Sequence, residues 1–126
     1  MTTFSLNLAK QIEAAKEQAE LVAKKITIEL FSRVIEKSPV DTGRFRANWN
    51  CSIGSPDLST SQAIDPSGSG AISKATSTVV SYTLNGQSVF LTNNLPYADR
   101  LENGWSKQAP NGMVRLSVME IENSVR

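Results

Sequence analysis

The chain has 126 residues, of which 40% are hydrophobic, enough for one domain with a modest core and too few for two. Its 13 Lys and Arg residues nearly balance 12 Asp and Glu residues, which argues against a protein whose main activity is nucleic-acid binding. With one Cys, no His, no signal-peptide pattern and no apolar run of roughly 20 residues, the chain lacks the residues of most catalytic triads and zinc sites and the marks of a membrane protein. We therefore expect a soluble, non-enzymatic protein of a cytoplasm, without metal or cofactor.

Residues 6–37 form the longest periodic segment and predict a helix roughly 45 Å long, at about 1.5 Å per residue. Ser5 or Asn7 is a candidate cap at its start. Pro39 disfavours helical geometry at Ser38, so the helix should end there. Charged residues on its polar side have the spacing of i,i+4 ion pairs, Glu20 with Lys24 and Glu29 with Arg33. One apolar face is predicted from residues at steps of three and four: Leu8, Ile12, Ala15, Ala19, Val22, Ile26, Leu30 and Val34.

The second half of this helix carries another apolar set on a different face: Leu21, Ile28, Phe31 and Ile35. A helix that is apolar around most of its circumference should be covered on more than one side. The rest of the domain could supply both covers, but we favour a neighbouring subunit for this second face. The four residues are therefore candidate interface residues.

The segment after Pro39 predicts a turn and then a strand. Asp41 and Gly43 are turn residues, and Gly43 can take a positive φ. From Phe45 to Ser52, apolar residues alternate with polar ones, the period of a half-buried strand. The alternation puts Cys51 on the apolar face as a small buried thiol, and puts Arg44 and Arg46 on the opposite, solvated face.

Residues 54–70 have the composition of a loop, because ten of these seventeen residues are Gly, Ser or Pro. Such a segment buries too little apolar surface to order itself, so we expect a flexible surface loop. Its two charges are Asp57 and Asp65. In an assembly, the loop is a candidate for contact with a neighbour.

The rest of the chain alternates short elements with turns. Residues 72–83 have helical spacing with Ser69 as a possible cap, although a first hairpin strand at 77–84 closed by Asn85-Gly86 is the alternative. Residues 88–92 predict a strand, and Pro96 begins a short helical turn to Glu102 that Gly104 ends. Residues 113–124 predict a final helix, with a strand around 114–118 left possible.

Trp105 stands out because it lies in a polar stretch, ENGWSKQAPNG. It either tucks back onto its own domain or stays exposed as an interface residue, where Trp is enriched among energetic hot spots. The carboxylates form no convincing catalytic pair. Glu102 could be a buried acid, but a single acid is weak evidence for catalysis.

Four motifs in a fixed order carry a resemblance: SPVDTG at 38–43, NNLPYA at 93–98, LENG at 101–104 and QAPNGM at 108–113. Preceded by a long helix and separated by a variable loop, this set resembles the neck or tail-completion (head–tail joining) proteins of long-tailed phages. The two stretches that hold these motifs, residues 38–49 and 89–115, cover about a third of the chain, and their arrangement with the long helix and the loop spans nearly all of it.

The resemblance implies a single virion-assembly domain over residues 1–126 with an α+β fold, the long N-terminal helix packing on a small, mainly antiparallel sheet with one or two further helices. It implies a homo-oligomeric ring, a hexamer, around the DNA channel at the head–tail junction, made in the host cytoplasm and incorporated into the virion. The implied partners are further copies of the chain, the connector on the portal side, the tail terminator or tail tube protein, and phage DNA that passes without sequence-specific binding.

The resemblance also gives the motif residues structural roles. Asp41 and Gly43 would shape the turn after the helix, and Tyr97 and Leu101 would pack the later turn onto the sheet. Glu102 would accept hydrogen bonds from nearby backbone or from Arg44. Asp57 and Asp65 would line the lumen or meet a neighbour. The remaining structural residues of the motifs are Pro39, Thr42, Asn94, Pro96, Gly104, Pro110 and Gly112.

Two alternatives stay open. Within the virion, a tail terminator or another minor tail component would have a similar small, ring-forming chain. In a different class, a nucleic-acid-binding module would use Arg44 and Arg46, and its DNA affinity would depend on salt.

Overall fold

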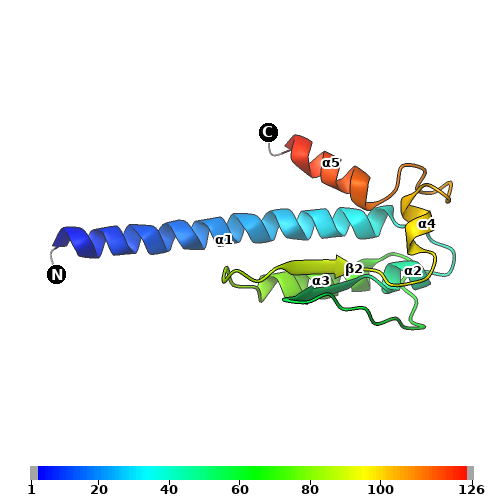
Figure 1. Cartoon of the computed structure of the whole chain (residues 1–126), viewed down its shortest axis with the longest axis horizontal. Coiled ribbons are helices and arrows are strands. Elements are labelled where there is room, and N and C mark those ends of the chain that lie inside the picture. Colours follow the sequence, from blue (N-terminus) through cyan, green and yellow to red (C-terminus); the bar gives the residue numbers. More distant parts are fainter. Residues whose placement is uncertain (1–2, 125–126) are drawn as a thin grey trace.

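The computed structural model describes the backbone of residues 3–124 and the side chains from Ala9 to Ser124 (Figure 1). Helix α1 (Thr3–Lys37) ends at the residue before Ser38, as Pro39 predicts. It begins upstream of Ser5 and Asn7, so the expected cap at either residue is wrong. Both expected ion pairs are present, Lys24 with Glu20 at 3.1 Å and Arg33 with Glu29 at 2.7 Å.

The strand predicted from Phe45 onward is wrong over its first half. Residues Arg44–Ala47 form the short helix α2, and only Asn50–Ile53 form a strand, β1. The alternation of apolar residues misleads here because Phe45 and Trp49 are also four apart, which suits a helical turn. Their rings meet edge to face, with centroids 5.7 Å apart, and both are buried.

The sheet has two antiparallel strands among the described residues. Strand β1 pairs with β2 (Val89–Thr92), with Asn50 opposite Thr92 and Ile53 opposite Val89. Helix α3 (Ser69–Val80) packs against β1, so the helical prediction for this region is confirmed and the hairpin alternative is wrong. Cys51 is half-buried in β1, and this burial raises the pKa of its thiol.

Two more helices complete the α+β fold. Helix α4 (Ala98–Glu102) is the helical turn predicted after Pro96, and α5 (Val114–Ser124) is the predicted C-terminal helix. The residues described thus contain four helices besides α1, where the motifs implied one or two.

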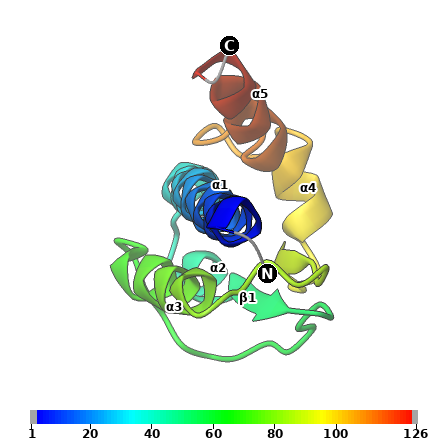
Figure 2. The same cartoon turned by 90° about the vertical axis from the view of Figure 1, so that its left-hand side faces the viewer.

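The core lies around the second half of α1. Figure 2 looks along α1 and shows α3 and β1 on one side of it and α5 on the other. Two ion pairs tie α5 to α1, from Arg33 and Lys37 to Glu120 at 3.0 and 2.8 Å. The core cluster consists of Phe31, Val34, Ile35, Phe45, Trp49, Ala71, Ala75, Val79, Leu95, Ala109 and Met113.

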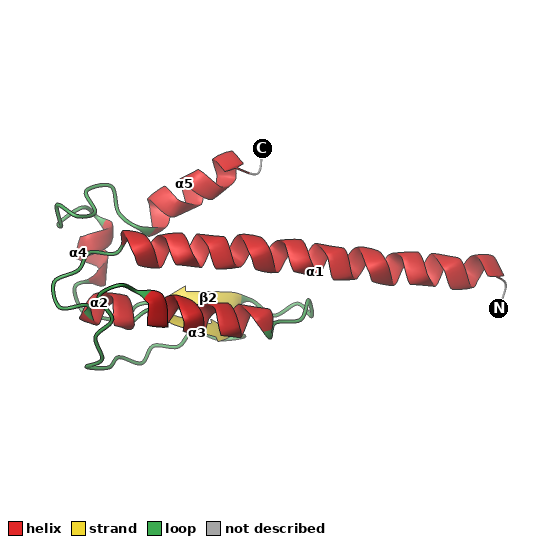
Figure 3. Ribbon diagram, turned by 180° about the vertical axis from the view of Figure 1, so that it is seen from behind, coloured by secondary structure: helices red, strands yellow, loops and turns green. Residues whose placement is uncertain are grey.

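The first half of α1 projects beyond this body as an arm (Figures 1 and 3). Every side chain from Ala9 to Ala19 is exposed, and partial burial begins at Glu20. No helix within residues 3–124 is long and apolar enough to cross a bilayer.

Candidate assembly surfaces

The turn after α1 is built around Gly43. Its φ of +97° is a left-handed conformation, and a Cβ atom placed on it would lie 2.5 Å from the backbone nitrogen of Pro66. The Gly43 carbonyl accepts a hydrogen bond from the Asp65 N–H at 2.9 Å. Pro39 is buried behind this turn, while Asp41 is exposed. Gly43 therefore shapes the turn and also lets the later loop pack directly on it.

Glu102 holds the start of α5. Its Oε1 accepts hydrogen bonds from the N–H groups of Met113 and Val114, both at 2.9 Å, and its Oε2 accepts one from Arg115 N–H at 3.0 Å. Partial burial favours the neutral acid, but these three N–H groups outweigh that effect, so the pKa of Glu102 is lowered. The expected backbone partners are thus present. The alternative pairing with Arg44 is wrong, because Arg44 Nε donates instead to the Ser61 carbonyl at 3.1 Å.

Two glycines allow the chain to close around Glu102. A Cβ on Gly112 would lie 2.5 Å from the Glu102 carbonyl oxygen, and one on Gly104 would lie 2.5 Å from the Pro110 carbonyl oxygen. Both have positive φ, +83° and +86°. Both positions therefore require glycine for two reasons: the backbone φ is positive, and there is no room for a Cβ atom.

Gln108 joins the first motif to the last. Its Nε2 donates to the Val40 carbonyl at 2.9 Å, and its Oε1 accepts from the Val40 N–H at 2.9 Å. The side chain therefore replaces a strand partner for one residue of the SPVDTG turn. Gln108 opens the QAPNGM motif, and its spacing from Val40 in the sequence gives no signal of this contact.

Between these segments lies an open cleft of about 460 Å³. The SPVDTG turn and Arg44 form one wall, and α4 and its neighbourhood form the other, with Tyr97, Leu101 and Gln108. Tyr97 packs against Phe45, with ring centroids 5.9 Å apart, and Leu101 packs against the core. Tyr97 thus contacts an aromatic residue of α2, where contact with the sheet was expected.

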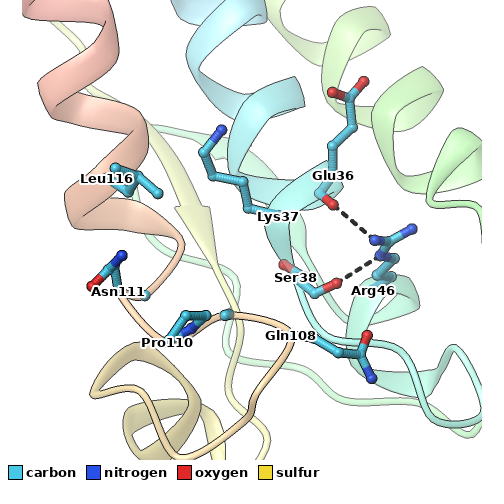
Figure 4. Close-up of a pocket in the computed structure, with 10 residues that line it drawn as sticks. Glu36, Lys37, Ser38, Arg46, Gln108, Pro110, Asn111 and Leu116 are labelled. Carbon is cyan, nitrogen blue, oxygen red and sulfur yellow. Dashed lines mark hydrogen bonds between the residues drawn. The ribbon is translucent and has the colours of Figure 1, made fainter.

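A smaller, open pocket of about 160 Å³ is lined by the end of α1, Arg46 and residues 108–112 (Figure 4). The guanidinium of Arg46 reaches into this region and donates to the carbonyls of Glu36 at 2.7 Å and Ser38 at 2.9 Å. A third hydrogen bond goes to the Pro66 carbonyl at 2.8 Å. Arg46 therefore caps the C-terminal end of α1 and fixes the loop on it, a role that the predicted solvated strand face did not anticipate.

The segment 54–68 has no helix or strand, as expected of a loop, but several side chains hold it to the domain. The fully buried Asn48 donates to the Ser61 carbonyl at 3.1 Å and accepts from the Ser61 N–H at 2.8 Å. Asn50 donates to the Ser59 carbonyl at 2.8 Å, and Asn94 donates to the Leu58 carbonyl at 3.1 Å. The last contact gives Asn94 its structural role.

The two acids of the loop differ in environment. Asp65 accepts a hydrogen bond from the Ala71 N–H at 2.9 Å, at the start of α3, so its carboxylate is occupied within the domain and not free to line a lumen. Asp57 is exposed and accepts hydrogen bonds from the Ser59 hydroxyl at 2.7 Å and the Ser59 N–H at 3.0 Å. These two contacts lower the pKa of Asp57.

The four candidate interface residues of α1 separate into two groups. Phe31 and Ile35 are buried in the core, so their proposed contact with a neighbour is wrong: α3 and the residues around it cover this face. Ile28 is partly buried against the same core, and Leu21 is 61% exposed. Leu21 alone of the four remains an exposed interface candidate.

Trp105 is 72% exposed, beside α4, with the Arg100 guanidinium 5.1 Å from its ring centroid. The alternative that it tucks back onto its own domain is therefore wrong. Trp105 and the α1 arm are two exposed apolar features at opposite ends of the molecule, since α4 lies near the C-terminal end of α1 (Figure 1). Exposed Trp of this kind suits a protein interface.

Comparisons with family models, with curated proteins and with solved structures find no match for this chain. Within the described residues, no group of three or more Asp, Glu or Cys side chains is placed to hold a metal ion.

Proposed function

We propose that this chain is a structural subunit of a tailed-phage particle that forms a ring at the head–tail junction, in the neck or tail-completion position, around the DNA channel. The proposal comes from the four ordered motifs, and six copies is the ring size that the resemblance implies. Its partners are the connector on the portal side and the tail terminator or tail tube protein. DNA passes through the ring without sequence-specific contact.

The observation that carries this proposal is the exposure of apolar side chains at two opposite ends of the molecule. Leu21, on the second apolar face of α1, is 61% exposed near the arm, and Trp105 is 72% exposed at the other end of the molecule. A ring subunit needs two unlike contact surfaces, because each copy meets one neighbour on each side.

The roles of the motif residues also support the proposal. Gly43, Gly104 and Gly112 build turns, and Glu102 holds the start of α5. Motifs that fix a framework suit a protein that acts by assembly. The nucleic-acid alternative is weakened because Arg46 spends its donors on three backbone carbonyls and Arg44 bonds to another.

Localisation tests the proposal directly. A copy of the chain tagged at its C-terminus and incorporated into particles should give extra density between the head and the tail tube in electron-microscope averages. Density on the capsid shell or at the distal tail tip would place the chain in another class. A tail terminator would give density at the same end of the tail, and isolated tails carrying the tag before head joining would identify it.

A further inference from the structure

The arm of α1 is a helix with an uncovered apolar stripe, formed by Ile12, Ala15, Ala19 and Val22. Ile12 is 49% exposed and Val22 46% exposed. A helical segment of this length has little stability of its own in water, and tertiary packing of an amphipathic face normally supplies the rest. The stripe therefore needs a partner.

The stripe lies on the same side of α1 that α5 covers further along. Arg33 and Lys37 form the ion pairs with Glu120 of α5. Arg33 lies eleven residues after Val22 of the stripe, and Lys37 lies eleven residues after Ile26, which continues the stripe. Eleven residues are about three turns, so these positions share a face to within about 20°. Figure 1 shows α5 running back along α1 and diverging from it before the arm. Near the C-terminal end of α1, this face is therefore already covered by an antiparallel helix, α5.

We propose that the arms of two copies of this chain pair antiparallel through the stripe, each continuing the layer that α5 begins on the other. The spacing is self-complementary about Glu17. Ile12 of one copy then faces Val22 of the other, and Ala15 faces Ala19. The two alanine positions at the centre let the helices approach closely, and the larger residues close the contact at both ends.

The charges around the stripe permit this contact. Gln11 and Gln18 flank it on one side and Lys16 on the other, so each copy brings one charge to the edge of the seam. Glu13 and Glu17 lie on the far side of the helix, well over 90° from the middle of the stripe at about 100° per residue. Long lysine side chains at a seam edge can stay in water while their stems cover apolar surface.

The pairing is weak and two-fold. Four short side chains per copy bury much less than the about 1,200 Å² of a standard interface, so the pair should dissociate readily. A two-fold contact uses the same patch on both copies and cannot by itself build a ring. This inference therefore stands apart from the proposed ring, and either one can fail without the other.

Disulfide trapping in the purified full-length chain tests the pairing. In a Cys51→Ser background, we would prepare Ala15→Cys and Ala19→Cys separately, then oxidise each alone and in an equal mixture at the highest attainable concentration. Because disulfides need Cα atoms within about 7 Å, only facing positions are trapped efficiently. The matched control is Ala14→Cys, exposed but off the stripe, mixed with Ala19→Cys.

The proposal predicts a covalent dimer in the Ala15→Cys plus Ala19→Cys mixture, little dimer in either variant alone or in the control mixture, and loss of the dimer when Ile12→Asn is added. Self-linked dimers of Ala19→Cys alone would indicate parallel arms and overturn the proposal. So would the absence of any dimer, which would leave the stripe to a different partner. Circular dichroism of each variant shows whether the chain stays folded.

Discussion

Gln108 and Val40, 68 residues apart in the sequence, exchange two hydrogen bonds of 2.9 Å. Through this contact the turn that ends α1 is fixed to the loop that leads into α5. The segments that carry the four motifs thus meet at one end of the molecule, around the cleft of about 460 Å³.

Replacing Gln108 with Ala should lower the free energy of unfolding by about 0.5–1.5 kcal/mol, because two hydrogen bonds to Val40 are lost, although water can reach the Val40 groups at this exposed position. Urea unfolding at neutral pH measures the change. Gln62→Ala, in the exposed part of the loop, is the control and should change stability by less than about 0.5 kcal/mol. Equal effects of the two substitutions would show that the Gln108 contact contributes nothing of its own.

Glu102→Gln should destabilise the chain at neutral pH by about 1 kcal/mol, at the low end for charge-assisted bonds because the carboxylate is partly in water. The pKa of Glu102 is lowered in the folded chain, so its contribution is present above the unfolded value near 4.5 and is lost as the pH falls through the folded pKa.

The measurement is unfolding by urea from pH 7 down to pH 3, for the wild type and for Glu102→Gln. The two stabilities should differ at pH 7 and converge in acid. Glu122→Gln, an exposed acid of α5, serves as the comparison and should track the wild type. A constant difference at every pH would contradict the role assigned to the carboxylate.

Comparing the stabilities of Gly112→Ala and Gly86→Ala separates the cost of backbone strain from the cost of a steric clash. Both glycines have similar φ, +83° and +87°, but a Cβ on Gly112 would meet the Glu102 carbonyl at 2.5 Å, whereas one on Gly86 meets nothing within 4 Å. Gly86→Ala should cost about 1 kcal/mol, and Gly112→Ala should cost clearly more. Thermal melting of both variants provides the comparison, and similar melting temperatures would rule out the steric part of the explanation.

Trp105→Ala should leave stability within about 0.5 kcal/mol of the wild type, because this side chain is 72% exposed. Under the proposed function it should nevertheless reduce incorporation of the chain into particles, as loss of an interface Trp commonly costs 2 kcal/mol or more of binding, roughly a thirtyfold change. Quantifying the chain in purified particles tests this. Normal incorporation with normal stability would remove Trp105 from the assembly surface.

Much of the fold could be predicted from the sequence because the signals were local. Pro39 ends α1, Gly104 follows α4, and the spacing of Val114, Val118 and Ile121 gives α5. Helix α2 could not be predicted in this way. Over so short a segment, the spacing of Phe45 and Trp49 suits both the two-residue repeat of a strand and the turn of a helix. The Gly43 turn decides between them only when the packing of Pro66 against it is known.

The contacts that fix the loop and the motifs could not be predicted because each joins a polar side chain to a backbone group more than ten residues away. Asn48 with Ser61, Arg46 with Pro66 and Glu102 with Met113 have no periodic signature in the sequence. The interface assignment of Phe31 and Ile35 failed for a related reason. Helix α3 lies more than thirty residues later in the chain, and its small residues Ala71 and Ala75 let it pack close enough to cover them.

The central claim is that this chain joins head to tail, and imaging of particles assembled with and without it tests that claim most directly. If the chain joins head to tail, particles made without it should appear as filled heads and finished tails that stay unjoined, or as tails with an incomplete upper end. Complete and infectious particles in its absence would rule out this role.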